Sequence, residues 1–291
     1  MKVFFGFFFL VILQFASAQN PQIFKLKKYR IAYLSDSLQE SSGLNFFGEQ
    51  LYTFNDSGNS SELFQIHPQS GKILNKIKLA IQNTDWEALE NDGSHFYIGD
   101  FGNNAGSRKD LKIYKIPLAT DSLHTDNIAA IPFFYPEQKN FAPKNLNHDY
   151  DTEAMIFHQG NINIFTKEWS SKAVTRYIIH PNITDSQAAV KLESYPINFV
   201  VTDAAYFSQK LYLVGYTKKT EVFLSIFTED DNGLFFNQKP QTYYLGTAFS
   251  VGQVEGIAVN DTGVYISSEK FVSPIGSAKA SVYFIPKVQL P

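Results

Sequence analysis

The sequence predicts an all-β protein, a β-propeller of four-stranded blades, with five blades favoured and six as the alternative. Three observations lead to this prediction. The 291 residues include 27 Phe and 16 Tyr but only 2 Met, and a bias towards aromatic residues is typical of strands. A short motif recurs at nearly even intervals, as in repeat architectures. Each copy is followed by short alternating runs bounded by Gly, Asn, Asp and Pro, which are typical of strands and turns.

The recurring motif is an acidic or polar residue, then a small residue, then an apolar or small one. Its five copies are Ser42–Leu44, Glu87–Leu89, Glu153–Met155, Asp203–Ala205 and Glu255–Ile257. Successive copies are 45, 66, 50 and 52 residues apart. Because the first strand of a propeller blade lines the central channel, we expect each copy in an innermost strand.

Three further strands are expected in each repeat. The second strands are predicted at 51–56, 96–100, 162–167, 211–216 and 264–269. The third strands are predicted at 63–67, 111–117, 175–180, 222–227 and 281–286. The fourth strands are predicted at 72–79, 128–135, 189–195 and 241–245. No stretch has a convincing helical period.

The fifth repeat has no fourth strand before Pro291. Residues 23–31 resemble the predicted strand 72–79, so we expect this N-terminal segment to complete the last blade. Such closure would leave no long unpaired strand edge. The irregular step of 66 residues predicts an insertion, and the polar segment 136–148 is expected to form an exposed loop near one face.

The N-terminus has the pattern of a secretory signal peptide. Lys2 precedes a largely apolar run over 3–15, and Ala16-Ser17-Ala18 fits a cleavage site. Thirteen residues are too few to span a bilayer, which needs about 20. We therefore expect residues 1–18 to be removed near Ala18 and residues 19–291 to form one domain. The expected location is secreted, periplasmic or extracellular, with no membrane span in the mature chain.

Composition and motifs exclude several functions. With no cysteine there is no disulfide, thiolate zinc site or cysteine nucleophile. A net charge of −3 argues against nucleic acid as a partner. No Gly-x-Ser-x-Gly elbow or phosphate-binding glycine loop is present. The six histidines are not spaced as zinc pairs, and only His148, beside Asp149 and Asp151, is worth testing as a ligand.

Two sets of polar residues are expected at one mouth of the channel, where first strands begin and second strands end. The candidate metal ligands are Asp85, Glu87, Asp151, Glu153, Asp203 and Glu255. The candidate ligand-binding residues are Asp56, Asp100, Arg108, Lys167, Trp169, Tyr216 and Glu269. Ser42 and Glu40 are expected in the same rings.

Converging carboxylates repel one another, and an unpaired buried charge costs several kcal/mol. A hard cation such as Ca²⁺ would offset that cost with oxygen ligands, as would paired Lys or Arg, or water. Alternatively, each acid could accept hydrogen bonds from the backbone of the neighbouring blade. Direct catalysis by these acids is a further alternative.

The strands containing Glu87–Leu89, Glu153–Met155 and Glu255–Ile257, with the run 97–103, resemble those of secreted bacterial β-propellers. The resemblance is to the group that includes phytase-like (esterase-like) propellers and relatives with NHL-type blades. It implies six blades in most members. Where members are active, it implies hydrolysis of phosphate or ester bonds with calcium at the channel mouth.

Three functional hypotheses follow. The first is a binding module with Ca²⁺ at the mouth, whose partner is a small molecule, a glycan or a protein. The second is a metal-assisted hydrolase of phosphate or ester substrates, in which Lys167, Arg108 and Lys218 neutralise substrate charge. The third is a glycosidase that uses two channel acids.

Overall fold

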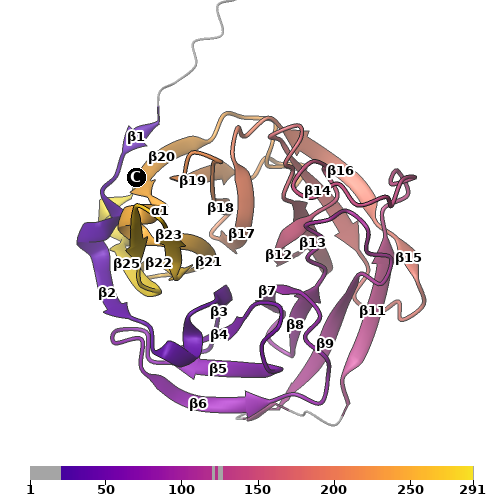
Figure 1. Ribbon diagram of the computed structural model, residues 1–291. Helices are drawn as coiled ribbons and strands as arrows, with labels where there is room; N and C mark the ends of the chain where they lie inside the picture. The colour runs from indigo at the N-terminus through magenta and orange to yellow at the C-terminus, as the bar shows by residue number, and fades with distance from the viewer. Residues whose placement is uncertain (1–20, 120–121, 124–126, 291) are drawn as a thin grey trace, which may run out of the picture.

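The structure is a five-bladed β-propeller, which confirms the predicted fold class and blade number (Figure 1). It is a computed structural model that describes residues 21–119, 122–123 and 127–290. The predicted signal peptide over 1–18 lies outside these residues. Each blade is a four-stranded antiparallel sheet whose first strand faces the channel (Figure 1). The alternative of six blades, usual for the resembling group, is wrong for this chain.

The strands of each blade are given from the channel outwards. Blade 1 contains β3 (Ser41–Phe47), β4 (Gln50–Asn55), β5 (Glu62–Ile66) and β6 (Ile73–Lys78). Blade 2 contains β7 (Trp86–Asn91), β8 (His95–Asp100), β9 (Lys112–Ala119) and β11 (Ala129–Phe134). Blade 3 contains β12 (Thr152–His158), β13 (Asn161–Thr166), β14 (Val174–Ile179) and β16 (Val190–Tyr195). Blade 4 contains β17 (Val200–Phe207), β18 (Lys210–Tyr216), β19 (Glu221–Thr228) and β20 (Gln241–Thr247). Blade 5 contains β21 (Gln253–Asn260), β22 (Gly263–Glu269), β25 (Ser281–Pro286) and β2 (Arg30–Tyr33).

The remaining elements are short. Extra strands are β1 (Gln22–Ile23) beside β20, β10 (Ser122–Leu123) beside β9, and β15 (Gln187–Ala188) beside β11. A hairpin of β23 (Phe271–Ser273) and β24 (Gly276–Ala278) projects from blade 5. The helices are η1 (Leu26–Tyr29), η2 (Asp36–Leu38), α1 (Ala248–Val251) and η3 (Lys287–Gln289).

The N-terminal segment closes the ring, as predicted, but its closing strand begins later than expected. β2 pairs antiparallel with β25 over Arg30–Tyr33, whereas the prediction placed the strand at 23–31. Leu26 is fully buried in the core between blades 4 and 5, so the chain turns into η1 there. Ile23 instead pairs with β20 of blade 4. The segment therefore joins two blades.

The hydrophobic core lies between neighbouring blades. The described residues form five apolar clusters, and each combines the facing surfaces of two adjacent blades. In the cluster between blades 1 and 2, for example, Phe54 packs edge-on against Trp86, with 5.5 Å between the ring centres. Because burying apolar area is the dominant favourable term in folding, a ring of such interfaces stabilises this cysteine-free chain.

Each innermost strand contains a β-bulge at which one residue has no partner on the second strand. The pairing skips Gly43, Glu87, Glu153, Thr202 and Glu255. This register corrects the alignment of the motif, because Gly43 and Thr202 hold the place expected for Ser42 and Asp203. Gly43 has a φ of 62°, and Thr202 donates its hydroxyl to the Val254 carbonyl at 2.7 Å. Blades 1 and 4 therefore contribute no acid at the bulge.

The expected insertion lies between β11 and β12, on the face where the first strands begin. Its backbone is tied to the loop after β8, with Lys144 N donating to Ala105 O at 2.8 Å and Leu146 N to Asn104 O at 3.0 Å. Residues 142–145 are exposed, as predicted, while Gln138 is buried and donates to Gly106 O at 2.8 Å.

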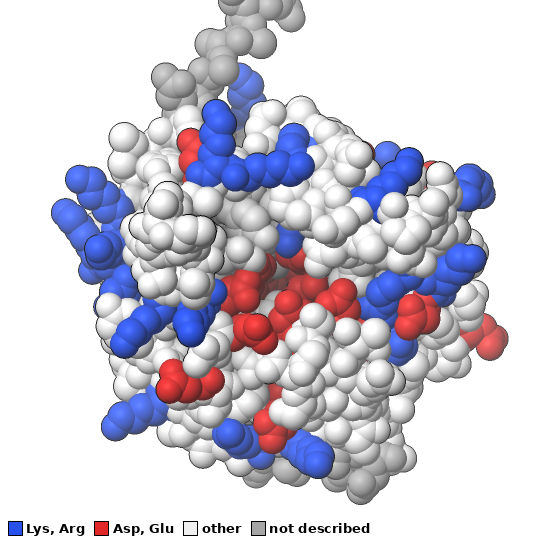
Figure 2. All heavy atoms as spheres, viewed as in Figure 1, with Lys and Arg blue, Asp and Glu red and all other residues white. Residues whose placement is uncertain are grey.

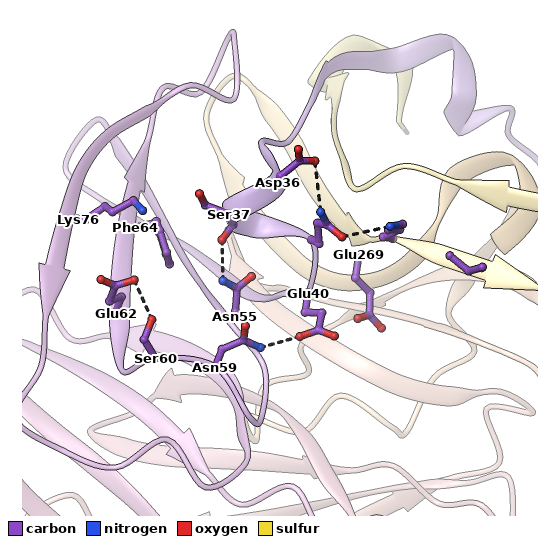
Figure 3. Close-up of a pocket in the computed structure, with 13 residues that line it drawn as sticks. Asp36, Ser37, Glu40, Asn55, Asn59, Ser60, Glu62, Phe64, Lys76 and Glu269 are labelled. Carbon is purple, nitrogen blue, oxygen red and sulfur yellow. Dashed lines mark hydrogen bonds between the residues drawn. The ribbon is translucent and has the colours of Figure 1, made fainter.

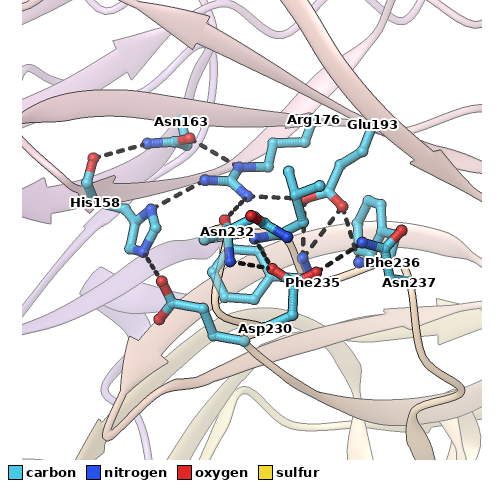
Figure 4. A network of polar contacts seen from close by, with 12 residues as sticks. His158, Asn163, Arg176, Glu193, Asp230, Asn232, Phe235, Phe236 and Asn237 are labelled. Atoms are coloured by element: carbon cyan, nitrogen blue, oxygen red, sulfur yellow. Dashed lines mark hydrogen bonds and ion pairs between the residues drawn. The ribbon is translucent and has the colours of Figure 1, made fainter.

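A buried polar network on the opposite face joins blade 3 to the loop after β19 (Figure 4). Arg176 donates to Asn163 Oδ1 at 2.8 Å, to Glu193 Oε1 at 2.8 Å and to Gly233 O at 2.9 Å. It also contacts His158 Nδ1 at 3.0 Å, and since a guanidinium only donates, Nδ1 must accept. His158 Nε2 then donates to Glu229 Oε1 at 2.9 Å. His158 is therefore neutral in the folded chain.

We predict that His158 makes the loop after β19 sensitive to acid. Burial lowers the pKa of His158. Below pH 6.5, near the ordinary pKa of histidine, the unfolded chain therefore binds a proton at this residue that the folded chain does not bind. His158→Gln should cost about 1–3 kcal/mol at pH 7 by leaving buried partners unsatisfied. This difference from the wild type should shrink as the pH falls from 7 to 5, measured by denaturant unfolding. The exposed His180→Gln is the control, and a difference that stays constant with pH would contradict the prediction.

Candidate functional site

Acidic side chains gather at the centre of one face of the propeller, in a hollow at the channel mouth (Figure 2). We call this cluster the acidic mouth. Its members, which come from blades 1, 2, 3 and 5 and their connections, are Asp56, Asp85, Glu87, Asp151, Glu153, Glu255 and Glu269. All are residues that the sequence predicts for a mouth site, so the predicted convergence of acids from successive blades is observed.

Three carboxylates of the acidic mouth are close enough to share one cation. One oxygen each of Asp56, Asp85 and Glu87 lie within 4.8 Å of one another. Asp56 follows β4, Asp85 precedes β7, and Glu87 is the bulge residue of β7. Gly102 leaves room for them, because a Cβ there would be 2.4 Å from Glu87 Oε1 and 2.5 Å from Asp85 Oδ2.

The electrostatics of these three acids favour neutralisation. Burial raises the pKa of Glu87 well above its ordinary value, and Asp56, Glu153 and Asp85 raise it further. Burial, followed by the charges of Asp56 and Asp151, raises the pKa of Asp85 to about 7. Burial also raises the pKa of Asp56, although the Ser57 N–H and Lys167 oppose the shift. A proton or a cation is the means by which such a group loses its net charge.

Among the described residues, Lys167, which follows β13, forms the direct ion pair with the acidic mouth. Its ammonium group forms a buried ion pair with Glu153. Burial disfavours the charge of Lys167, but Glu153, Tyr216 and Glu255 outweigh it and raise the pKa of Lys167 well above its ordinary value. Lys167 also lies 5.3 Å from the ring centre of Tyr216, whose pKa is raised by burial. Both residues are therefore where the sequence predicts them.

Glu255 and Glu269 form a second pair of acids, on blade 5. Gln253 Nε2 bridges them, donating to Glu255 Oε1 and to Glu269 Oε1 at 2.7 Å each. Burial raises the pKa of each to about 8. The charge of Glu269 adds to the shift of Glu255, and the charge of Asp56 adds to the shift of Glu269. Oε2 of Glu255 and Oε2 of Glu153 are buried and have no hydrogen-bond partner among the described residues. These acceptors are available to a cation or to water.

Two candidate metal ligands instead bind the backbone of a neighbouring blade. Asp203 accepts from Ala204 N at 2.8 Å and from Ile257 N of blade 5 at 2.7 Å. Burial raises the pKa of Asp203, and the charge of Glu90 raises it further. Asp151 accepts from Asn103 N of blade 2 at 2.7 Å, although its Oδ2 is buried without a partner in the described chain. Asp203 thus fits the alternative in which an acid links two blades.

Asp100 and Arg108 pair with each other beside the acidic mouth. Arg108 Nη2 lies 2.9 Å from Asp100 Oδ1, and Lys112 Nζ lies 3.6 Å from Asp100 Oδ2. The charge of Asp100 is therefore already balanced. His148 is also engaged, because its Nε2 lies 3.1 Å from Asn104 O and its Nδ1 accepts from Tyr150 N at 3.1 Å. Backbone contacts occupy both ring nitrogens, so the geometry does not support a metal-ligand role.

Three lysines surround the Trp169 ring on the other side of the mouth. The ammonium groups of Lys167, Lys172 and Lys218 lie 5.5, 5.4 and 5.5 Å from its ring centre. Lys172 and Lys218 come from the loops after β13 and β18, and repulsion from Lys218 contributes, after burial, to a lowered pKa of Lys172. The indole Nε1 is buried with no partner in the described residues. Blades 3 and 4 therefore present positive charge beside the acids.

A polar groove with a volume of about 670 Å³ runs from the mouth between blades 1 and 5 (Figure 3). We call it the rim groove. Its lining includes Glu40, Asn55, Asn59, Glu62, Lys76 and Glu269. Sequence analysis predicted Glu269 and Glu40 at the mouth but missed Glu62 and Lys76. These two come from β5 and β6, which carry no repeated polar motif.

Fold and site together define a five-bladed β-propeller with an acidic channel mouth, and comparisons with known proteins add no family. No known protein family and no curated protein matches the sequence. Among solved structures, a candidate 6-phosphogluconolactonase from Bacteroides uniformis is 14% identical with a TM-score of 0.39, over 88% of this chain and 72% of that one. A second such candidate, from Bacteroides fragilis, is 11% identical with a TM-score of 0.43, over 83% of each chain.

A candidate oxidoreductase of the glucose dehydrogenase type from Thermus thermophilus is 11% identical, with a TM-score of 0.48, over 88% of this chain and 98% of that one. We draw nothing about chemistry from similarity at this level. The resemblance to phytase-like and NHL-type propellers stays a prediction. No helix within the described ranges is long and apolar enough to cross a bilayer.

We predict that the metal-free protein loses stability as the pH rises from 6.5 to 8. Asp85, Glu255 and Glu269 hold protons in the folded chain that the unfolded chain releases near pH 4, because their folded pKa values are about 7, 8 and 8. The free energy of unfolding therefore declines between the two sets of pKa values and levels off above them. Thermal unfolding in EDTA measures this slope. Glu269→Gln should make the slope shallower, and an equal slope in both proteins would refute the assignment.

Proposed function

We propose that the protein is a secreted binding module that holds a divalent cation, Ca²⁺, in the acidic mouth. The observation that carries this proposal is the convergence of Asp56, Asp85 and Glu87, with one oxygen of each within 4.8 Å. Carboxylate oxygens are the ligands that Ca²⁺ prefers. The unpartnered buried oxygens of Glu153 and Glu255 supply further acceptors at the same mouth.

The acids fit a cation better than they fit an acid–base pair. Lys167 neutralises Glu153 through their ion pair, and no residue that the structure describes forms a comparable ion pair with Asp56, Asp85 or Glu87. A glycosidase uses two carboxyl groups at a set separation, whereas a cation requires several oxygens that approach one point, which is the arrangement of this trio.

Secretion is part of the proposal and is supported by the sequence over 1–18, with its apolar run and Ala16-Ser17-Ala18. A weak Ca²⁺ site suits an exported protein, because extracellular Ca²⁺-binding modules have dissociation constants of about 0.1–1 mM. The partner is then a molecule that meets the mouth outside the cytoplasm.

We predict that Ca²⁺ raises the melting temperature by about 5–10 °C when its concentration is a hundredfold above Kd. Binding to the folded chain alone contributes about 2.7 kcal/mol at that ratio, and each kcal/mol shifts the melting temperature of a domain of this size by a few degrees. Glu87→Gln should abolish most of the rise, because it removes one of the three converging carboxylates.

The matched control is Glu49→Gln, which makes the same chemical change in the exposed turn after β3, on the opposite face. Its melting temperature should respond to Ca²⁺ as the wild type does. Isothermal titration calorimetry on the three proteins gives the affinity directly. The absence of any Ca²⁺ response in the wild type would eliminate the proposed cation site.

A metal-assisted hydrolase is the second candidate, because positive charge lies beside the acidic mouth. Lys172 and Lys218 flank Trp169, 5.4 and 5.5 Å from its ring centre. Their positive charge would attract the phosphate of an ester, and Lys172 also donates to the Trp169 carbonyl. In such an enzyme a cation held by Asp56, Asp85 and Glu87 would supply Lewis-acid polarisation of the scissile bond and an activated water.

The hydrolase candidate predicts Ca²⁺-dependent release of nitrophenol from p-nitrophenyl phosphate, or turnover of p-nitrophenyl acetate or a lactone. Lys218→Met should lower kcat/KM for the phosphate ester at least tenfold, because it removes one of the positive charges beside Trp169. Lys78→Met, at an exposed position of β6, is the matched control. Inactivity on the whole panel, with and without Ca²⁺, removes this candidate and leaves the binding module.

A further inference from the structure

The rim groove has the dimensions of a site for an organic ligand. Its volume of about 670 Å³ lies within the roughly 300–1,000 Å³ typical of small-molecule sites. It shares Glu269 with the acidic mouth, and the charge of Asp56 acts on Glu269. A molecule in the groove would therefore extend to the mouth.

The inner wall of the groove offers one buried acceptor that lacks a donor among the described residues, Asn55 Oδ1. Asn55 is only 7% exposed, and its Nδ2 donates to Ser37 O at 2.7 Å, which fixes its Oδ1 as an acceptor. That Oδ1 is buried without a partner in the described residues, although Asn55 lines the groove. Leaving a buried acceptor unsatisfied costs about 1–3 kcal/mol. A ligand with a donor group would relieve that cost.

The charges around the groove disfavour an anionic ligand. Four acids line it, Asp36, Glu40, Glu62 and Glu269, against two lysines, Lys76 and Lys270. Both lysines already have contacts, because Lys270 Nζ donates to Gln39 Oε1 at 3.2 Å and Lys76 Nζ lies 5.1 Å from the ring centre of Phe64. A neutral molecule rich in hydroxyl groups avoids that repulsion, and its hydroxyls can donate to the same carboxylates. The excess of acids would also attract a cation, so the test includes a cationic probe.

We propose that the rim groove binds a neutral saccharide. Sugar hydroxyls would donate to Asn55 Oδ1 and to the carboxylate of Glu40. Only one part of this inference rests on the proposed function: the end of the sugar nearest the mouth would reach the Ca²⁺, for which hydroxyl oxygens are suitable ligands. The contacts in the groove itself do not require the cation.

The test uses saturation-transfer-difference NMR on the full mature chain with maltose, cellobiose, lactose and trehalose. Glucose 6-phosphate and spermidine are the anionic and cationic counter-probes, and each probe is run with Ca²⁺ and with EDTA. We expect signals from at least one neutral disaccharide. Ser60→Trp fills the groove from an exposed position and should raise the Kd of that disaccharide at least tenfold. Glu40→Ala should raise the Kd by a smaller factor.

Ser186→Trp makes the same change at an exposed site in the loop before β15, on the opposite face, and should bind as the wild type does. A melting temperature of Ser60→Trp in EDTA close to that of the wild type shows that this variant is folded. A Ca²⁺ response without any disaccharide signal overturns the saccharide inference and leaves the cation site. Disaccharide binding without a Ca²⁺ response supports the groove and rejects the cation. Preference for glucose 6-phosphate or spermidine, or equal binding by Ser60→Trp, also overturns the inference.

Discussion

The acidic mouth brings together more negative charge than Lys167 can neutralise. Glu153 takes the direct ion pair with Lys167, and the trio of Asp56, Asp85 and Glu87 has no equivalent cation in contact among the described residues. A buried charge without a partner costs several kcal/mol, so the carboxylates respond through raised pKa values. This stored repulsion is a cost to folding, and a cation or a ligand donor that enters the mouth can recover it.

The fold holds the acids together because none of them can move away independently. Asp56 belongs to blade 1, Glu87 to blade 2 and Glu153 to blade 3, and an apolar cluster fills each interface between these blades. Separating the carboxylates would require opening those interfaces. The N-terminal strand β2 completes blade 5, so the ring has no open side through which it could relax.

The sequence predicted the fold well because propeller repeats are local and periodic. Most strands begin and end within about one residue of the predicted bounds, as β13 does at Asn161–Thr166 against 162–167. The bulges could not be predicted, because an extra residue in a strand appears only in its pairing with the next strand. This is why Asp203 was aligned with Glu87, when Thr202 holds that place. The rim groove was missed because Lys76 and Asp36 belong to an outer strand and a connection without repeated polar residues.

The two sides of the mouth differ in charge, and this difference constrains how any ligand can bind. Blades 1 and 5 present acids and the rim groove, whereas blades 3 and 4 present Lys172 and Lys218 around Trp169. A phosphate held by the lysines and a neutral sugar held in the groove would approach the same trio of carboxylates from different sides. In either arrangement, a cation held between the carboxylates would offset the repulsion at the centre. The side that a ligand occupies therefore separates the binding module from the hydrolase, and the carboxylate trio by itself does not.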